Sequence, residues 1–395
     1  MIPYAKQDIT KNDINAVKKV LESNFLTQGP VVEKFENIVA KKINSKYAIA
    51  LNNATSALHL SCLALGVGPN DWVWTSPNSF VASANCAAYC GAKLDFVDID
   101  SKTYNISVSE LEKKLEIAKI KKKLPKVIIP VHFAGQPCEM FKIYKLGKKY
   151  NFKIIEDASH AIGSSYAFSD NFKNNPELVK VGSCKHSDIT VFSFHPVKII
   201  TTGEGGMVLT NQKNLYERIK LLRSHGIVRE KKKMNKKSDG PWYYQQVDLG
   251  YNYRMNDMEA AIGCEQIKRL NKYIKLRHKI AKRYNNAFAD LPLNKPWQLP
   301  KTYSAFHLYV ITLNNNYNKK KHFNIFRKMR KKGIGVNLHY IPIHTQPYYS
   351  RMGFKKGDYP VAENYYKRAI SLPMYPSLTK KEQDFVIKNL RECLK

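Results

Sequence analysis

The sequence predicts an α/β fold: a large domain built on a mainly parallel β-sheet with helices on both faces, followed by a smaller α+β domain. Three observations lead to this prediction. Short apolar segments alternate with helical patterns over the first two-thirds of the chain, which is the order expected of βαβ units. Several of these segments are apolar at nearly every position, as strands covered on both faces are. The alternation ends near Asn256, where one long helical pattern begins.

Candidate strands for the large sheet follow one another in chain order. The seven are KYAIAL (46–51), DWVWTS (71–76), KLDFVDI (93–99), KVIIPVHF (126–133), FKIIEDA (152–158), DITVFSF (188–194) and GGMVLT (205–210). Helical patterns occupy residues 56–67, 81–92 and 109–123 between them. Because parallel strands need a crossover between them, these intervening helices favour a mainly parallel sheet of seven strands.

The long pattern from Asn256 to Leu291 predicts a single helix. Asn256 can cap it, and Glu259 stands three residues later, as in a capping box. This helix would lead from the large domain, residues 1–255, into the small one, residues 256–395.

The remaining elements of the small domain lie beyond Pro292. They are a strand at 308–313, a helix at 320–333, a strand at 335–341 and a last helix from Thr379 to about Leu394. Two segments, 169–180 and the lysine-rich 230–239, are expected to be mobile loops.

Composition limits the classes of function. The chain has 395 residues, of which 44% are hydrophobic, and can bury a large core. Its formal net charge of +33 is compatible with nucleic-acid binding. The lysines are spread over many segments and not along one stripe, however, so we expect a generally basic surface and no nucleic-acid partner. Such a surface would attract an anionic substrate, for example a nucleotide-linked sugar.

The cysteines and the apolar runs argue against a metal protein and against a membrane protein. The seven cysteines are scattered, and Cys86 and Cys90, four residues apart, are better explained as small core residues than as metal ligands. We therefore expect no disulfide and no metal. No apolar run is long enough to cross a bilayer, and residues 1–12 lack the apolar core of a signal peptide, so we expect a cytoplasmic protein.

The strongest functional signal is FSFHPVKIITTGEGG, from Phe192 to Gly206. It places Lys198 between an apolar strand and a glycine-rich turn, whereas most lysines of this chain are expected to be solvated. Lysine condenses with aldehydes to give a Schiff base. A second strand ends at Asp157, which either caps the following turn or pairs with a protonated ring nitrogen. Together these two groups are what an enzyme that uses pyridoxal phosphate requires.

Three further segments fit a bound cofactor, although each also has an ordinary structural explanation. NNATSAL (52–58) follows a strand and opens a helix, so Thr55 and Ser56 lie where a helix N-terminus binds phosphate, or where it is merely capped. Phe80 can stack on an aromatic ring or belong to the core. His160, three residues after Asp157, can lie beside the ring or pack inside the protein.

Substrate contacts are predicted later in the chain. Arg229 can meet a substrate phosphate, although a solvated surface arginine is the commoner case. His339 and Tyr340 belong to HYIPIHTQPYY (339–349), whose histidine spacing does not match a helical metal pair and which we interpret as a substrate-facing loop. Asn252 and Arg254 are polar groups in a tight aromatic run.

These motifs, taken in order, resemble the pyridoxal phosphate-dependent sugar-nucleotide aminotransferases of the DegT/StrS type, within the fold-type-I superfamily. The resemblance runs nearly end to end. It rests on SNFLTQGP, NATSALHL, SFVASAN, FVDID, VHFAGQP, EDASHAIGS, DITVFSFHPVKIITTGEGGMV, LRSHGI, LGYNYRMND and YIPIHTQPYY.

The resemblance implies a role for each matching residue. Lys198 would form the covalent link to the cofactor, Asp157 would pair with the ring nitrogen, His160 would lie near the ring and Phe80 would stack on it. The phosphate would be bound by Thr55, Ser56 and Ser193, joined by Asn252 of a second subunit, which implies a homodimer with shared active sites.

The implied activity is transfer of an amino group from L-glutamate to the 4-keto group of a UDP-linked N-acetylated 6-deoxy sugar. Family members that act as dehydratases carry histidine in place of Lys198, so its presence favours transamination. Two alternatives remain open: a dTDP- or GDP-linked keto sugar aminated at the 3- or 4-position, and a protein that binds nucleic acid or senses the cofactor. The segment 166–181 is longer than the family pattern, so substrate specificity is the least constrained part of the prediction.

Overall fold

A seven-stranded sheet forms the centre of the computed structural model, which describes residues 1–169, 177–314 and 318–394. Its order is β1-β9-β8-β5-β4-β2-β3. The strands are β1 (Tyr47–Leu51), β2 (Trp72–Thr75), β3 (Lys93–Phe96), β4 (Val127–Ile129), β5 (Lys153–Asp157), β8 (Ile189–Ser193) and β9 (Gly206–Thr210). Each of the seven predicted strands is present. The prediction of a mainly parallel sheet is confirmed, because β9 is antiparallel to both neighbours while β5, β4, β2 and β3 pair in parallel with one another and with β8.

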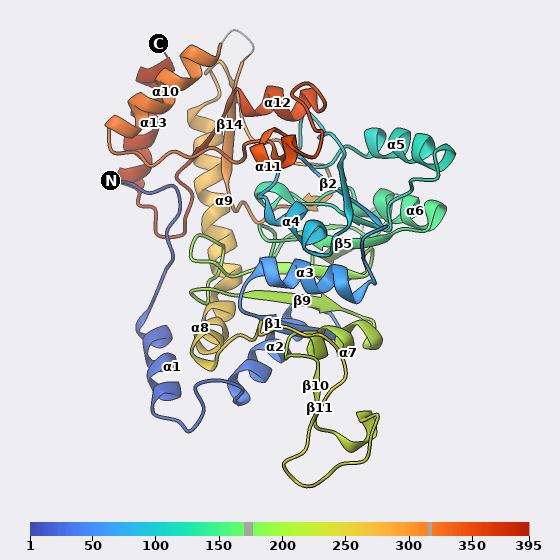
Figure 1. Ribbon diagram of the computed structural model, residues 1–395. Helices are drawn as coiled ribbons and strands as arrows, with labels where there is room; N and C mark the ends of the chain where they lie inside the picture. Colours follow the sequence, from blue (N-terminus) through green and yellow to red (C-terminus); the bar gives the residue numbers. More distant parts are fainter. Residues whose placement is uncertain (170–176, 315–317, 395) are drawn as a thin grey trace.

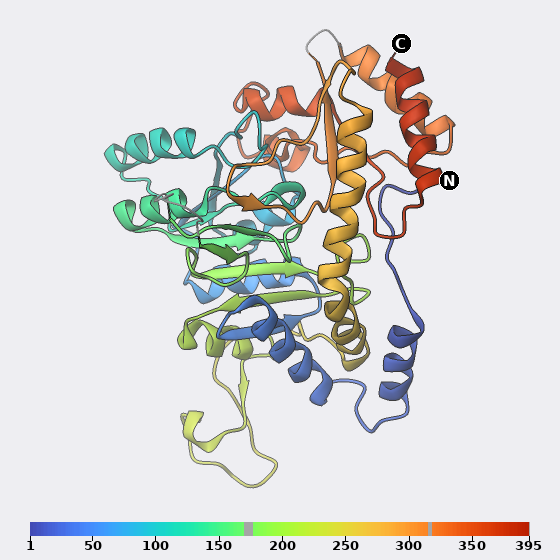
Figure 2. The same ribbon diagram turned by 180° about the vertical axis from the view of Figure 1, so that it is seen from behind.

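Both faces of this sheet are buried, as the continuous apolar strands require. Alternate residues of a strand enter two different apolar clusters: Ala48 and Ala50 on one face, Ile49 and Leu51 on the other. The first face is covered by α2 (Pro30–Ile43), α5 (Val108–Ile120), α6 (Met140–Tyr150) and α8 (Asp257–Gln266). The second is covered by α3 (Ala54–Ala64), α4 (Ala82–Tyr89) and α7 (Lys213–Leu222), and the two faces are seen in Figures 1 and 2.

A long helical rod connects the large sheet to the C-terminal part of the chain (Figure 1). The predicted capping box is confirmed, since the Glu259 amide donates to the Asn256 side chain at 2.9 Å and the Asn256 amide to the Glu259 carboxylate at 3.1 Å. The prediction of one uninterrupted helix was wrong. A 3₁₀ turn, η3 (Ile267–Arg269), separates α8 from α9 (Leu270–Ala287). At this break Arg269 turns toward α1 (Lys11–Leu21) and binds the buried Asp13 at 2.6 Å.

The C-terminal part has its own three-stranded antiparallel sheet, β12 (Leu293–Asn294), β14 (Tyr309–Leu313) and β15 (Ala369–Leu372). It packs with the second half of α9, with α10 (Lys319–Lys331) and with α13 (Lys380–Leu394). The predicted strand at 335–341 was wrong, because that segment makes a single bridge, Asn337 to Ser371, before running toward the large sheet. Strand β15, which was not predicted, pairs with β14 instead.

The proposed division at residue 255 falls just before the cap of α8. The first half of α9 belongs to the core of the large sheet and the second half to the C-terminal core, so the boundary itself stays a prediction. Shorter helices complete the chain: α1 (Lys11–Leu21), α11 (Pro347–Ser350) and α12 (Pro360–Tyr366). None of the helices in the described ranges is both long and apolar enough to span a membrane.

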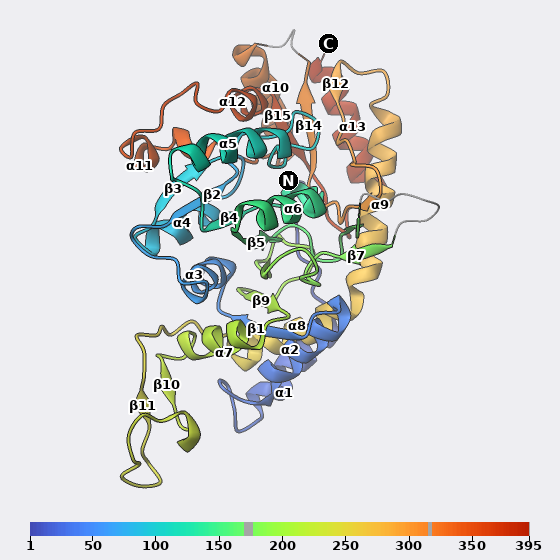
Figure 3. The ribbon, with the colours of Figure 1, turned by 90° about the vertical axis from the view of Figure 1, so that its right-hand side faces the viewer.

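Two small sheets lie at the edges. One of them consists of β6 (Ser165–Ala167), β7 (Leu178–Lys180) and β13 (Thr302–Tyr303). The segment 169–180, predicted to be a loop, therefore ends in a strand, and its residues 170–176 lie outside the described residues. Strands β10 (Ile227–Val228) and β11 (Gln245–Gln246) form a ribbon, called the arm below (residues 227–246), which projects from the body in Figures 1 and 3. The lysine-rich 230–239 lies in the arm and includes a short 3₁₀ turn, η2 (Lys231–Lys233).

Candidate active site

The candidate site lies at the carboxyl edge of the large sheet, where ligands of α/β proteins commonly bind. Asp157 is the last residue of β5 and Ser193 the last residue of β8, and Lys198 follows in the loop between β8 and β9. These three residues line one cavity of about 630 Å³. Thr55, Phe80, His160, His339 and Tyr340 line it too, so eight of the predicted site residues meet in one place.

Lys198 and Asp157 face the same space with opposite charges. Burial lowers the pKa of Lys198 to about 8, against the pull of the Asp157 carboxylate, which favours the charged amine. The carboxylate is held by the hydroxyl groups of Ser83 and Ser159, each at 2.6 Å, and by the Ser159 amide at 3.1 Å. A carboxylate fixed in this way can hold a cationic ring nitrogen in the cavity.

The N-terminus of α3 opens onto the cavity at Thr55. Asn53 caps the helix by accepting the Ser56 amide at 2.8 Å. Ser56 itself is buried and does not line the cavity. Gly206 lets this end of the helix lie against β9, because a Cβ at that position would be 2.4 Å from the Asn53 carbonyl. The amides of a first helical turn have no partner inside the helix and favour a phosphate.

Phe80 presents an apolar ring at the cavity, with 58% of the residue exposed. Its ring centroid is 6.3 Å from that of Tyr340. An aromatic side chain that is left open toward a cavity is suited to stack on a flat ring.

The two predicted histidines differ in what they offer a ligand. Burial, with the charge of Lys198, holds the pKa of His160 well below its ordinary value, and its ring contacts the Tyr340 hydroxyl at 3.1 Å. His339 has both ring nitrogens engaged, with Ser371 at 2.8 Å and with Asn337 at 3.4 Å. His339 lines the cavity, and both of its ring nitrogens already have partners within the protein.

Arg229 and Asn252 lie away from this cavity. Arg229 is exposed on the arm, with its guanidinium 5.3 Å from the ring centroid of Tyr244. Asn252 is exposed and forms a bridge with Ser224. Neither residue therefore contributes to the lining of this cavity within one chain.

Sequence reasoning missed several residues of the site. Ser83 and Ser159 bind the Asp157 carboxylate. Ser159 could have been predicted, because it stands two positions after Asp157 in the sequence. Ser83 lies in α4, and nothing in the sequence connects it with Asp157. His307 lies 4.3 Å from His160 between ring centroids and also lines the cavity. Only the fold brings this residue of the C-terminal part to the sheet edge.

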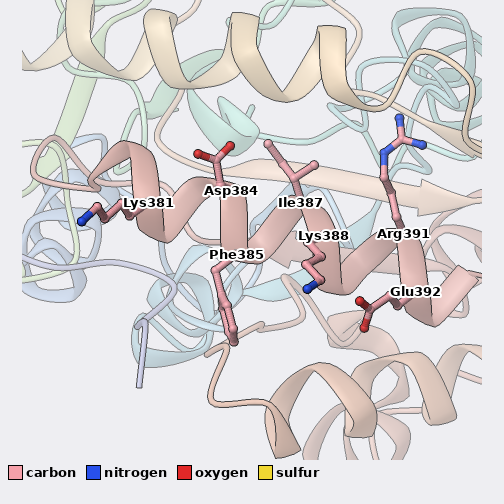
Figure 4. A pocket seen from close by; sticks show the side chains of 7 residues that line it. All are labelled: Lys381, Asp384, Phe385, Ile387, Lys388, Arg391 and Glu392. Carbon is pink, nitrogen blue, oxygen red and sulfur yellow. The ribbon is translucent and has the colours of Figure 1, made fainter.

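A larger hollow, about 720 Å³, lies along α13 and offers no comparable chemistry. Figure 4 shows its side chains pointing to both sides of one helix without converging on a common point. Three of its charged side chains are paired within the protein: Asp384 with Arg283, Glu392 with Lys332 and Arg391 with Asp290.

The cavity at the sheet edge fits pyridoxal phosphate. It offers a reactive amine of lowered pKa, a fixed carboxylate, an open aromatic ring and a helix N-terminus for the phosphate. Fold and site together define an enzyme of fold type I that uses pyridoxal phosphate.

Comparison with known proteins identifies the family. The sequence matches the model of the DegT/DnrJ/EryC1/StrS aminotransferase family over residues 7–391, so the chain belongs to that family. Protein MJ1066 of Methanocaldococcus jannaschii is 41% identical, with 96% of this chain and 94% of that protein covered. The UDP-4-amino-4,6-dideoxy-N-acetyl-beta-L-altrosamine transaminase of Campylobacter jejuni strain 81-176 is 39% identical, with 98% and 96% covered.

Comparison with solved structures also finds aminotransferases. PseC of Helicobacter pylori, an aminotransferase of pseudaminic acid biosynthesis, superposes with a TM-score of 0.88 at 31% identity, covering 100% of this chain and 99% of that one. Spr1654 of Streptococcus pneumoniae, described as a sugar aminotransferase, superposes in its PLP form with a TM-score of 0.86 at 28% identity, covering 99% and 98%.

Proposed function

We propose that this aminotransferase moves an amino group from L-glutamate to the 4-keto group of a UDP-linked N-acetylated 6-deoxy sugar. The observation that carries the proposal is the meeting of Lys198, Asp157 and the N-terminus of α3 on one cavity. The similarity to the C. jejuni transaminase and to PseC supports the sugar class, as do the motifs NATSALHL, SFVASANCA and FSFHPVKIITTGEGG.

Each residue of the cavity has its own role in the proposed reaction. Pyridoxal phosphate, when bound, supplies an aldehyde carbon that exchanges amino groups and a ring that withdraws electrons. The N-terminus of α3, with Thr55 and Ser193, holds the phosphate, and Phe80 covers the ring. Asp157 keeps a positive charge at the ring nitrogen. The amine of Lys198, once neutral, would take a proton from the donor carbon and deliver it to the aldehyde carbon of the cofactor, so that one atom serves first as general base and then as general acid.

The substrate-binding residues and the oligomer belong to the same proposal. Tyr340 and His339 border the cavity, and Arg229 would reach the substrate from the arm of a second subunit. Asn252 of that second subunit would join the phosphate site. The active form would thus be a homodimer with shared sites.

The test is an assay of the purified protein with pyridoxal phosphate, L-glutamate and a panel of keto sugars linked to UDP, dTDP or GDP. We expect amination of the UDP-linked 4-keto sugar, seen as a mass change of the sugar nucleotide. Glutamate alone should bleach the yellow cofactor. Preference for a dTDP or GDP sugar would reassign the substrate. Salt-sensitive DNA binding without amino transfer would overturn the enzyme class.

Lys198→Ala should lower the amino-transfer rate by about 10²- to 10⁴-fold or more, because it removes both the covalent link and the base. The matched control is Lys213→Ala, an exposed lysine at the start of α7, which should leave the rate unchanged. If Lys198→Ala retains the normal rate, the assigned role is wrong.

A further inference from the structure

Ala134 has an unusual backbone conformation beside the site. Within the 3₁₀ turn Phe133–Gly135 it adopts φ +57° and ψ 9°, a left-handed conformation that non-glycine residues rarely take. The surrounding structure holds it there: its carbonyl accepts the Leu308 amide at 3.3 Å, and the Gly135 carbonyl accepts the Ser164 hydroxyl at 2.8 Å. Such conformations persist where the structure imposes them, and they cluster at functional sites.

This turn directs the Ala134 amide at His160. The N–H group donates to Nδ1 of His160 at 3.3 Å. A backbone amide can only donate, so Nδ1 carries a lone pair and no proton. The lowered pKa of His160 keeps the imidazole neutral, and its one ring proton is therefore on Nε2.

The proton on Nε2 determines how Tyr340 is oriented. Nε2 lies 3.1 Å from the Tyr340 hydroxyl oxygen and must donate to it. Burial raises the pKa of Tyr340, so the phenol keeps its own hydrogen. Among the described residues His160 is the sole hydrogen-bond partner of that hydroxyl. The phenolic hydrogen is left for a ligand in the cavity that Tyr340 lines.

We propose that Tyr340 is the hydrogen-bond donor of this cavity to an oxygen of the bound ligand, and that His160, locked by the Ala134 amide, is the positioning residue that sets its direction. The inference rests on the proposed function for the identity of the ligand. The acceptor is a phenolate or carbonyl oxygen, supplied either by the cofactor ring or by the keto sugar.

The tautomer is tested without cofactor or substrate. Nitrogen NMR of the full-length, histidine-labelled, cofactor-free protein, with the His160 signals assigned by their loss in His160→Gln, should show a proton on Nε2 and none on Nδ1 from about pH 6 to about pH 8. A proton on Nδ1, or a charged ring, would overturn the proposal. This result does not depend on which sugar is used, so it can fail while the proposed function stands.

The direction of donation is tested by two substitutions at His160. A glutamine amide can occupy the position of Nε2 and still donate to Tyr340, whereas an asparagine amide reaches only the position of Nδ1. His160→Asn should therefore behave like Tyr340→Phe, and the double variant should be no worse than either single one. His160→Gln should retain most of the function. Two results would contradict the positioning of Tyr340 by His160: an equal loss of activity in both His160 variants, or additive losses in the double variant.

Tyr340→Phe separates the two sources of the oxygen. If the acceptor belongs to the cofactor, the affinity for pyridoxal phosphate should fall and the absorption of the loaded protein should change without any sugar. If it belongs to the keto sugar, cofactor affinity and the glutamate half-reaction should be unchanged, while kcat/KM for the sugar half-reaction should fall about 10- to 100-fold. Tyr309→Phe, which removes a buried hydroxyl bonded to Asn285, is the control. If neither cofactor binding nor the sugar half-reaction changes, the proposal is wrong.

Discussion

The amine of Lys198 owes its reactivity to its surroundings. Its pKa of about 8 reflects two opposed effects: burial, which disfavours the charged amine, and the Asp157 carboxylate, which favours it. Below about pH 8 the amine is mostly protonated and cannot attack an aldehyde; above that pH it is mostly neutral.

Covalent capture of pyridoxal phosphate should follow this titration. We expect the capture rate of the cofactor-free protein to rise about tenfold per pH unit below about pH 8 and then to level off. Borohydride trapping followed by mass measurement of the protein gives the rate at each pH. Asp157→Asn should move the midpoint to lower pH, because the charge that favours the protonated amine is gone. A midpoint near the ordinary lysine value of 10.5 would mean that the amine is solvated.

At the scale of elements, the site depends on the contact between α3 and β9. Gly206→Ala would place a Cβ 2.4 Å from the Asn53 carbonyl and 2.6 Å from the Ala54 amide. Since these are backbone atoms, the helix N-terminus must move. We expect a loss of about 1–3 kcal/mol of unfolding free energy and weaker cofactor binding, measured by denaturant unfolding and by titration with pyridoxal phosphate.

Gly68→Ala is the control for this contact. A Cβ at Gly68 would meet nothing within 4 Å, and its φ is not in the left-handed region. This variant should keep both stability and cofactor affinity. Normal cofactor binding by Gly206→Ala would show that the N-terminus of α3 does not hold the phosphate.

Elements with a strong local signal could be predicted, and those defined by distant contacts could not. The strands of the large sheet are apolar on both faces, and Asn256 with Glu259 marks a helix start by side-chain chemistry alone. Segment 335–341 carries a strand-like pattern, but its only ladder contact is from Asn337 to Ser371. The strand that pairs with β14 is instead β15, which begins 28 residues after this segment ends.

The same distinction applies to the site. Lys198 and Asp157 stand beside recognisable strands and turns, so local motifs predicted them. His307 reaches the cavity from the segment that precedes β14, and nothing near it in the sequence indicates that position. The role of Ala134 depends on a backbone conformation, which its neighbours in the sequence do not reveal.

At the scale of the whole molecule, the arm is a two-stranded ribbon that carries exposed apolar side chains. It projects from the body in Figures 1 and 3. Trp242 and Leu249, the latter just beyond the arm, are each 73% exposed. Exposed large apolar side chains on a projecting ribbon are typical of a surface that is covered by a partner. In the proposed homodimer that partner is a second copy of the chain, and the arm would place Arg229 at the cavity of that second copy.

Mixed dimers test this exchange. We expect Lys198→Ala and Arg229→Ala each to be impaired as pure proteins. In a dimer with one chain of each kind, the chain that keeps Lys198 would receive an intact Arg229 from its neighbour, so one of the two sites is complete. Such dimers, purified through two different tags, should recover about half of the wild-type activity. Lys198→Ala paired with Asp157→Asn is the matched control: both residues line the same cavity of one chain, so neither site is complete and no activity should return. If the Arg229 mixture also stays inactive, Arg229 does not act across the dimer.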